Sequence, residues 1–224
     1  MFATIILDAY KKDEVQQISD ALDDLCNAND NYGWASAGIY CFWDYYTNEI
    51  YYIGLAVDLE ERFKQHNGLI PIDENSCKKA KINEYFKHNE KLGYSIFVQS
   101  PLSQPITSKN KKKWEKVKVE DFSALDLRNS EDRNDLKIVE GILIESYRRK
   151  HGDFPKWNRV GGSINGKGRS TLGNYYIVKS FTHQSPLVAH STLREISSNP
   201  TIERYENYLF AVRFYMLYFG MSLI

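Results

Sequence analysis

Three observations on the 224-residue sequence predict a small mixed α+β core. Two strand-like segments, 35–43 and 50–55, flank a polar turn, which is the pattern of a hairpin with a longer loop. Apolar residues in 134–150 recur at the three- and four-residue steps of a long helix. The predicted elements follow one another as strand, strand, helix, helix, strand, helix, an order typical of an α+β domain.

The elements around the hairpin follow from local patterns. Residues 2–8 alternate weakly between apolar and polar and predict an edge strand. Residues 13–27 predict a helix, because apolar side chains recur at helical spacing, at Val15, Ile18, Leu22 and Leu25. After the hairpin, Asp58 is expected to cap a helix with Glu61 as its capping-box partner, and this helix runs through His66.

The second half of the chain is less regular. We expect a short helix over 80–89, a third strand over 94–99 and a lysine-rich loop or insertion over 101–118. Residues 175–181 are rich in β-branched and aromatic side chains and predict a further strand. From residue 192 onward the pattern is mostly helical.

The composition supports two opposite expectations about binding to nucleic acid. Apolar residues make up 42% of the chain, which is enough for a hydrophobic core, and the formal net charge is zero. A neutral chain argues against electrostatic binding of nucleic acid. The charges are separated, however, because residues 8–30 are mainly acidic and residues 147–170 are mainly basic. The protein can therefore present a basic face while staying neutral overall.

The cysteine positions and the sequences near the two ends of the chain predict the compartment in which the protein works. The three cysteines, Cys26, Cys41 and Cys77, are far apart and form no zinc or disulfide pattern. No basic stretch followed by a long apolar one opens the chain, so we expect no signal peptide and a cytoplasmic, reducing setting. Residues 208–224 are apolar but shorter than the roughly 20 residues of a membrane span. Arg213 interrupts them, so a buried or interfacial helix is preferred over a tail anchor and no membrane partner is expected.

The hairpin carries two tyrosines inside glycine-bounded triplets. Gly38-Ile39-Tyr40 lies on its first strand and Tyr52-Ile53-Gly54 on its second. Side chains alternate along a strand, so Tyr40 and Phe42 are expected on the opposite side from Ile39 and Cys41, with Tyr52 across from Tyr40. Alone, two phenols on one face are most simply an aromatic cross-strand pair.

The helix after the hairpin adds polar groups next to its apolar stripe. Arg62 and His66 are one helical turn apart and fall on the same face as Leu59 and Phe63. A salt bridge or a snorkelling arginine would also account for that placement.

The long helix 134–150 contains a carboxylate where its pattern is apolar. Glu140 projects among Leu136, Ile144 and their neighbours, whereas Glu145 is expected on the solvent side. A buried carboxylate requires a cationic partner, so Glu140 predicts either a buried Glu–Arg pair or a metal or catalytic group.

A glycine-rich stretch and a lysine-rich stretch are further candidates for contact with DNA. Asn158 follows Trp157 after a proline, in a position to bond local backbone. The glycine-rich stretch 154–171 is plausible as a loop that meets a DNA backbone through its N–H groups, although it lacks a nucleotide-binding pattern. The lysine cluster in 101–118 predicts phosphate contacts or a merely solvated surface. The expected DNA-contacting residues are Lys111, Lys112, Lys113, Arg159, Lys167 and Arg169.

Taken in order, these residues resemble the GIY-YIG nuclease family. The two triplets look like its naming motifs, Arg62 and His66 like its helix pair, Glu140 like its metal-binding glutamate and Asn158 like its late asparagine. The resemblance spans about 35 to 160 and, through 156–169, is most similar to the restriction endonucleases of that family. It implies an α+β fold with a small three-stranded antiparallel sheet flanked by helices. We accordingly divide the chain into an extension (1–34), a nuclease core (35–170) and a helical extension (171–224).

The resemblance also implies an activity and a division of roles. The reaction would be hydrolysis of DNA phosphodiester bonds with one divalent cation, Mg²⁺ or Mn²⁺ in its place, bound by Glu140. Arg62 would stabilise the phosphoryl oxygens. Tyr40 is the preferred general base, with Tyr52 positioning it or the water, and His66 would relay the proton or orient Tyr40. Asn158 would hold this catalytic cluster in place.

Several functional classes stay open at this level. The leading hypothesis is a type II restriction-type enzyme acting as a homodimer on palindromic double-stranded DNA, with the C-terminal apolar helix as a candidate interface. A cognate methyltransferase would then exist as a separate protein. The alternatives are a structure-specific repair nuclease, a mobile-element endonuclease and a non-cleaving DNA-binding module.

Overall fold

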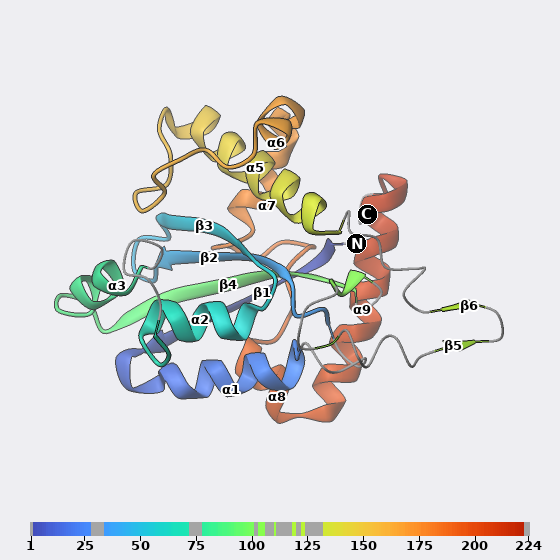
Figure 1. Cartoon of the computed structure of the whole chain (residues 1–224), viewed down its shortest axis with the longest axis horizontal. Helices are drawn as coiled ribbons and strands as arrows, with labels where there is room; N and C mark the ends of the chain where they lie inside the picture. Colours follow the sequence, from blue (N-terminus) through green and yellow to red (C-terminus); the bar gives the residue numbers. More distant parts are fainter. Residues whose placement is uncertain are drawn as a thin grey trace.

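A four-stranded antiparallel sheet in the order β1-β4-β2-β3 separates two layers of helices (Figure 1). The computed structural model describes residues 2–27, 34–71, 78–100, 103–105, 110, 118–119, 122–123 and 132–221. The strands of the sheet are β1 (Phe2–Lys11), β2 (Gly38–Asp44), β3 (Ile50–Ala56) and β4 (Lys91–Gln99). The predicted α+β class is confirmed. The three strands expected from the resemblance are present, and β1 joins them as the edge strand that residues 2–8 predicted.

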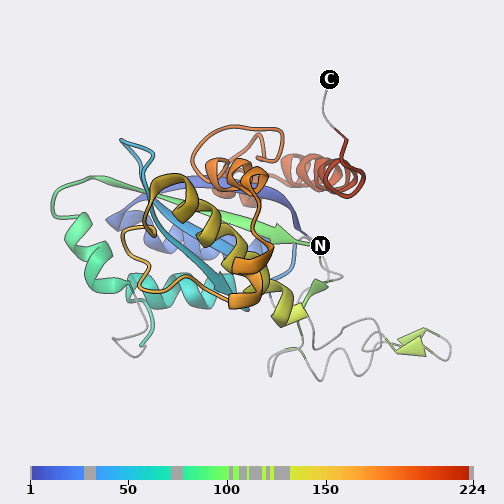
Figure 2. The same cartoon turned by 90° about the horizontal axis from the view of Figure 1, so that it is seen from above.

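Helices cover both faces of this sheet. One layer contains α1 (Val15–Leu25), α2 (Leu59–Asn67) and α8 (Leu193–Ser198), and α3 (Lys79–Tyr85) follows α2 at one end of the sheet. The other layer contains α5 (Asp132–His151), α6 (Ile164–Arg169) and α7 (Tyr175–Lys179). Seen from above, α5 crosses the sheet, and α6 packs along α5 (Figure 2). The last helix, α9 (Pro200–Phe219), lies beside β1.

The alternation predicted for the hairpin is confirmed by the two hydrophobic cores. Tyr40 and Phe42 belong to the core under α1, α2 and α8, whereas Ile39 and Cys41 belong to the core under α5 and α7. The strand β2 is fully buried, because it pairs with β3 on one side and with β4 on the other.

Helix α2 begins and ends as its sequence predicts. The Asp58 side chain accepts a hydrogen bond from the Glu61 backbone N–H at 2.9 Å, which satisfies one of the unpaired donors of the first turn. Gly68 follows the helix in the left-handed conformation, at φ 77°. These two caps fix the register of the helix that carries Arg62 and His66.

The strand expected over 175–181 is wrong, since this segment forms the helix α7. The strand preference of its aromatic and β-branched residues is overridden by tertiary packing. Val178 and Phe181, which are three residues apart, both bury against the core under α5. That spacing places two side chains on one face of a helix but on opposite faces of a strand.

The glycine-rich stretch is partly helical, which changes the meaning of its glycines. Gly166 lies within α6, and a Cβ added to it would collide with the carbonyl oxygen of Ile138 on α5. A Cβ on Gly141 would lie 2.7 Å from the Ser163 carbonyl oxygen. Gly162 adopts a φ of 69°, which favours glycine. These glycines therefore allow α6 to pack closely on α5, and this packing accounts for them without a phosphate cradle.

The N-terminal strand is held by residues from the far end of the chain. The outer edge of β1 is bridged at Ile5, whose backbone bonds to Leu187 and Ala189. Arg194, at the start of α8, donates to the buried carboxylate of Asp8 at 2.9 Å. Covering an edge strand in this way blocks its pairing with other chains.

Two further findings concern the remaining sequence predictions. Lys111, Lys112 and Lys113 lie outside the described residues, and the described part of that region contains a short ladder between β5 (Lys118–Val119) and β6 (Phe122–Ser123). Within the described ranges, no helix has both the length and the apolarity needed to cross a bilayer.

Candidate active site at the rim of strand β3

The candidate site lies along the outer edge of β3, where residues from four separate segments meet. Asn158 forms two bonds with Ile53, because its Oδ1 accepts from the backbone N–H at 3.0 Å and its Nδ2 donates to the carbonyl oxygen at 2.8 Å. Two residues further along the strand, the Leu55 N–H donates to Glu140 Oε1 at 3.2 Å. The exposed edge of β3 is therefore paired by side chains, and two predicted site residues are fixed by the same strand.

The two tyrosines come together diagonally rather than directly across the hairpin. Tyr40 pairs with Gly54, and Tyr52 pairs with Phe42. The rings of Tyr40 and Tyr52 are 5.7 Å apart between centroids. A Cβ on Gly54 would lie 2.6 Å from the Tyr52 ring and 2.9 Å from the Tyr40 hydroxyl oxygen. The second triplet therefore needs glycine, because a side chain there would occupy the space of the two phenols.

His66 is bonded on both ring nitrogens, and this determines its tautomer. The backbone N–H of Lys78 donates to Nδ1 at 3.0 Å, so Nδ1 is an acceptor. The proton of the neutral ring then lies on Nε2, which donates to the Tyr40 hydroxyl oxygen at 2.7 Å. Burial, with Arg62 and Lys78 nearby, lowers the pKa of His66 to about 3. The ring therefore stays neutral and orients Tyr40, which favours that role over proton relay.

Burial and a nearby cation shift the pKa values of both tyrosines in opposite directions. Burial raises the pKa of Tyr40 well above its usual value, and the Arg62 guanidinium acts in the opposite direction. Burial also raises the pKa of Tyr52, with Glu140 adding to the effect and Arg62 opposing it. Tyr40 is 2% exposed, whereas Tyr52 is only partly buried. Arg62 is thus the cation that acts on both phenols, and no carboxylate in the described part of the chain forms an ion pair with it.

Glu140 is a half-buried carboxylate with no cation beside it among the described residues. Burial raises its pKa to about 7, and the hydrogen bond from Leu55 offsets only part of that effect. A carboxylate in this position is costly when ionised, unless a positive charge comes from outside the protein. Of the two alternatives that the sequence left open, the Glu–Arg pair is not formed between Glu140 and any arginine of the described residues.

The Glu–Arg pair occurs instead at Glu145, which the sequence analysis wrongly placed on the surface. Glu145 is 2% exposed and accepts hydrogen bonds from Arg148 at 2.8 Å and from Arg149 at 2.9 Å. These bonds, led by the one from Arg148, lower its pKa to about 2. The prediction failed because α6 and α7 cover a second side of α5, which an amphipathic pattern does not anticipate. Two of the basic residues that were counted toward a basic face are therefore already paired.

The residues at the rim fit a hard divalent cation held by few protein ligands. A single carboxylate suits Mg²⁺, which keeps most of its waters. In the described segments no group of three or more His, Cys, Asp or Glu side chains is placed to hold a metal ion, so a closed all-protein cage is absent there. Glu140 is the available carboxylate, and its uncompensated burial is the feature that a cation would relieve.

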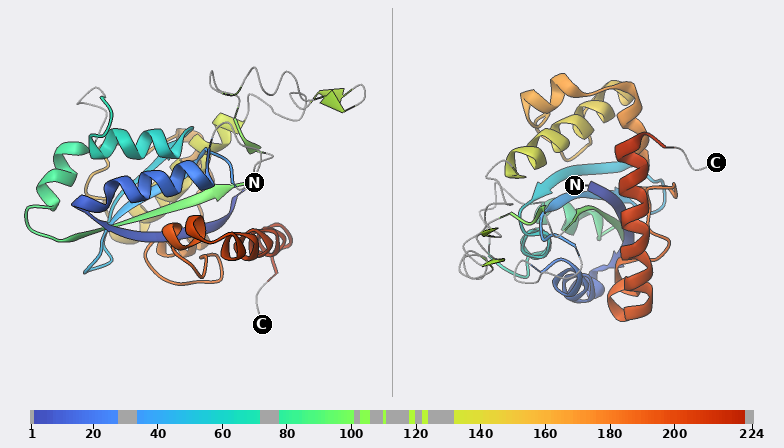
Figure 3. Two further views of the ribbon diagram at one scale, coloured as in Figure 1. Left: turned by 90° about the horizontal axis from the view of Figure 1, so that it is seen from below. Right: turned by 90° about the vertical axis from the view of Figure 1, so that its right-hand side faces the viewer.

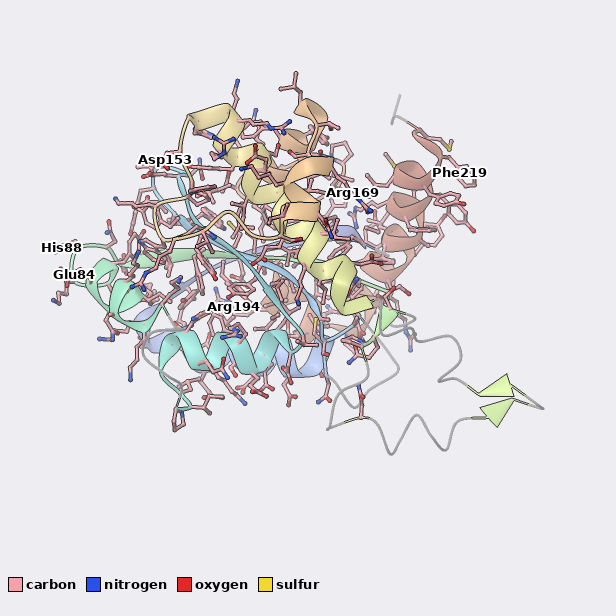
Figure 4. The ribbon with its side chains drawn as sticks, turned by 45° about the horizontal axis from the view of Figure 1, so that its top comes forward. Glu84, His88, Asp153, Arg169, Arg194 and Phe219 are labelled. Atoms are coloured by element: carbon pink, nitrogen blue, oxygen red, sulfur yellow. The ribbon has the colours of Figure 1, made fainter. Side chains whose placement is uncertain are left out.

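Three basic residues that follow Asn158 in the chain form no ion pair with any carboxylate of the described residues. Arg159, Lys167 and Arg169 are exposed, as a role in backbone contact requires (Figure 4 labels Arg169 on α6). Beyond the β3 rim, Lys81 and Lys156 line a hollow of about 420 Å³ next to Trp157. The pKa of Lys81 is lowered, first by burial and then by the neighbouring Arg159, as expected where cations gather.

Sequence reasoning missed Lys78. Its N–H fixes the His66 tautomer, and its Nζ lies 4.6 Å from the centroid of the Tyr52 ring, in cation–π contact. Nothing in the local pattern could indicate it, because a backbone donor has no residue signature. The lysine lies just before α3.

Comparison of the chain with protein-family models, with curated proteins and with solved structures finds no match in any of the three.

Proposed function

We propose that this protein is a GIY-YIG-type endonuclease that hydrolyses phosphodiester bonds of double-stranded DNA with Mg²⁺, or Mn²⁺ in its place. The observation that carries the proposal is a half-buried carboxylate, Glu140, that bonds to the edge of β3 and has no described cation beside it, while Tyr52 on the same strand meets Tyr40 and both phenols lie close to Arg62, which pairs with no described carboxylate. An unpaired buried carboxylate next to perturbed titratable groups is typical of a functional site.

The reaction can be described from the chain's own residues. Glu140 would hold the cation, which supplies positive charge to the phosphate oxygens and the leaving 3′ oxygen. Arg62 would bind the non-bridging oxygens and stabilise their charge in the transition state. Tyr40 would take the proton of the attacking water, because its hydroxyl oxygen already receives the N–H of His66 and a phenolate there would keep that bond.

The other residues would position this group. Tyr52, which is only partly buried, would hold the water against Tyr40. Asn158 would fix β3 and so the spacing between Tyr52 and Glu140. Arg159, Lys167 and Arg169, together with Lys111, Lys112 and Lys113, would bind the DNA backbone, and this binding should weaken steeply with salt.

Within this proposal, a restriction-type enzyme is preferred. It would act as a homodimer in the cytoplasm, whose reducing conditions suit the buried free thiols of Cys26 and Cys41. A separate methyltransferase would protect the host DNA. Sequencing the ends after digestion of a mixed-sequence genome tests this preference, because a restriction enzyme leaves one recurrent palindrome, whereas repair and mobile-element nucleases do not.

The direct test is cleavage of supercoiled plasmid. The wild type should nick and linearise it with Mg²⁺ but not with chelator, and Glu140→Gln should be inactive while still binding DNA. Asp135→Asn is the matched control, since this residue is an exposed carboxylate on the same helix. If wild type and Glu140→Gln both leave plasmid and genomic DNA intact with either metal, while DNA binding persists, the protein is a non-cleaving binding module.

A further inference from the structure

Helix α9 has its polar and apolar faces reversed relative to a surface helix. Its buried residues are Glu206 and Arg213, which are 0% and 4% exposed. Its exposed residues are largely aromatic and include Tyr205, Tyr208, Tyr215, Tyr218 and Phe219. A surface helix of a protein that works alone normally buries its apolar face and exposes its charges. The outward face of α9 therefore indicates a partner.

The buried ion pair fixes α9 to the body of the protein. Arg213 Nη1 donates to Glu206 Oε2 at 3.1 Å, and Nη2 donates to the Val188 carbonyl oxygen at 3.0 Å. Glu206 Oε1 accepts the backbone N–H of His190 at 2.7 Å. The helix is held by these polar bonds to 188–190 and by Ile202 and Phe210, which pack on the core. Figure 3 shows α9 along one side of the molecule.

The outward residues have the spacing of a helix–helix seam. They follow one another at alternating steps of three and four residues, the repeat by which two helices pack along a shared stripe. We call this set the aromatic stripe; it consists of the exposed Tyr205, Tyr208, Tyr215 and Phe219 and the half-buried Val212 between them. Figure 4 shows Phe219 at the outer end of this helix.

We propose that the aromatic stripe packs against the same stripe of a second copy of this chain, with the two helices antiparallel. The stripe is nearly symmetric about its centre, because Val212 is flanked on each side by two aromatic residues. A two-fold axis at Val212 places the small residues of both copies together, where the helices approach most closely, and sets Tyr205 of one copy against Phe219 of the other. Such self-complementarity is the defining property of an interface between identical surfaces.

The exposed area is of the size that a modest dimer requires. Tyr205, Tyr208, Tyr215 and Phe219 are 54%, 67%, 57% and 61% exposed. With about 150–250 Å² for each aromatic side chain, these four expose roughly 400–500 Å². Tyr218 flanks them and is 71% exposed, which brings the total to roughly 500–650 Å² on each copy. That area is below the roughly 800 Å² that each partner buries in a standard interface and corresponds to the small end of specific interfaces.

The charge of α9 favours a second copy over a lipid surface. A helix that lies on a membrane carries a polar face rich in lysine and arginine. The charged residues of α9 are Glu203, Arg204, Glu206 and Arg213, two acidic and two basic, and the last two are paired with each other. A neutral, tyrosine-rich face fits another copy of itself.

The first test is the mass of the full chain in solution, measured by light scattering or sedimentation over a range of concentrations without DNA or metal. We expect twice the 26.1 kDa of one chain, and a monomer for the double variant Tyr208→Glu/Tyr215→Glu. Tyr46→Glu is the control, because this tyrosine is 55% exposed on the β2–β3 turn and should leave the dimer intact. Circular dichroism and thermal melting verify that each variant is folded.

The second test reads the antiparallel register by cross-linking in a Cys77→Ser background. Under mild oxidation Val212→Cys should give a disulfide-linked dimer. Tyr205→Cys should not link to itself, but should link to Phe219→Cys when the two proteins are mixed.

A wild type that stays monomeric at all concentrations overturns the inference, and so does a double variant that stays dimeric. Self-linkage of Tyr205→Cys would show parallel helices, and sedimentation of the wild-type monomer with neutral or anionic vesicles would assign the stripe to lipid. The inference rests on the proposed function in one respect, since it gives the homodimer of the restriction-type enzyme its interface. These measurements use no DNA, so a monomeric wild type would refute the interface without refuting the nuclease activity.

Discussion

Replacing Glu140 with glutamine should stabilise the metal-free protein at alkaline pH. The folded state holds this carboxyl at a pKa of about 7, raised by burial, against an ordinary value of 4.5. Below pH 4.5 the group is protonated in both the folded and the unfolded chain, so it makes no difference to stability. Between pH 4.5 and 7 only the folded chain binds the proton, so the free energy of unfolding falls as pH rises.

The size of this effect follows from the pKa difference. At about 1.4 kcal/mol for each pH unit, the interval corresponds to about 3 kcal/mol, which the wild type has lost by pH 8. Glutamine does not ionise and can still accept the Leu55 N–H, so the variant avoids that loss. Its amide donor requires a new partner, which reduces the expected gain to about 2 kcal/mol.

Urea unfolding in chelator at pH 5 and pH 8 measures the difference between wild type and Glu140→Gln. Groups that titrate equally in both proteins cancel in this comparison. Mg²⁺ added at pH 8 should stabilise the wild type alone, because binding to the folded state shifts unfolding by mass action. The reasoning is refuted if the free energies of unfolding of wild type and Glu140→Gln differ by the same amount at pH 5 and pH 8. That result would mean that the Glu140 carboxyl is either exposed to solvent or neutralised by a counter-charge.

Three further changes test separate parts of the structure. Tyr40→Phe should lower the rate of plasmid cleavage by about 10²–10⁴-fold, which is the range for loss of a general base. Tyr52→Phe should lower the rate less. If single-turnover rates show the reverse order, the general base is Tyr52. Gly166→Ala should lower the free energy of unfolding by about 1–3 kcal/mol in urea titrations, because the added methyl group collides with a backbone carbonyl of α5. Arg213→Met should lower the free energy of unfolding by about 3–5 kcal/mol, because it leaves Glu206 buried and unpaired. The double variant Arg213→Met/Glu206→Leu should recover much of that stability in thermal melts.

Elements with a clear local pattern could be predicted from the sequence. The hairpin, the capped helix α2 and the long helix α5 are confirmed, because each is specified by the spacing of apolar residues or by a cap. The grouping of Tyr40, Tyr52 and His66 was also anticipated, and the structure brings these three rings together.

What could not be predicted depends on contacts between distant segments. The burial of Glu145 arises from helices that follow α5 in the chain, so a single-helix pattern placed it on the surface. The Lys78 N–H that fixes His66 is a backbone group, and α7 forms against its own strand preference. The outward aromatic face of α9 is invisible in sequence, because periodicity gives the two faces of a helix but not which face is turned inward.

The covering of β1 by residues from the far end of the chain has a consequence for synthesis on the ribosome. The first strand made is paired on one side by β4, but its other side stays open until Leu187 and Ala189 have emerged. Until then, a nascent chain exposes a strand edge that neighbouring nascent chains can join. Fragments that stop before Leu187 should therefore aggregate during translation, even though they contain all the residues of the β3 rim.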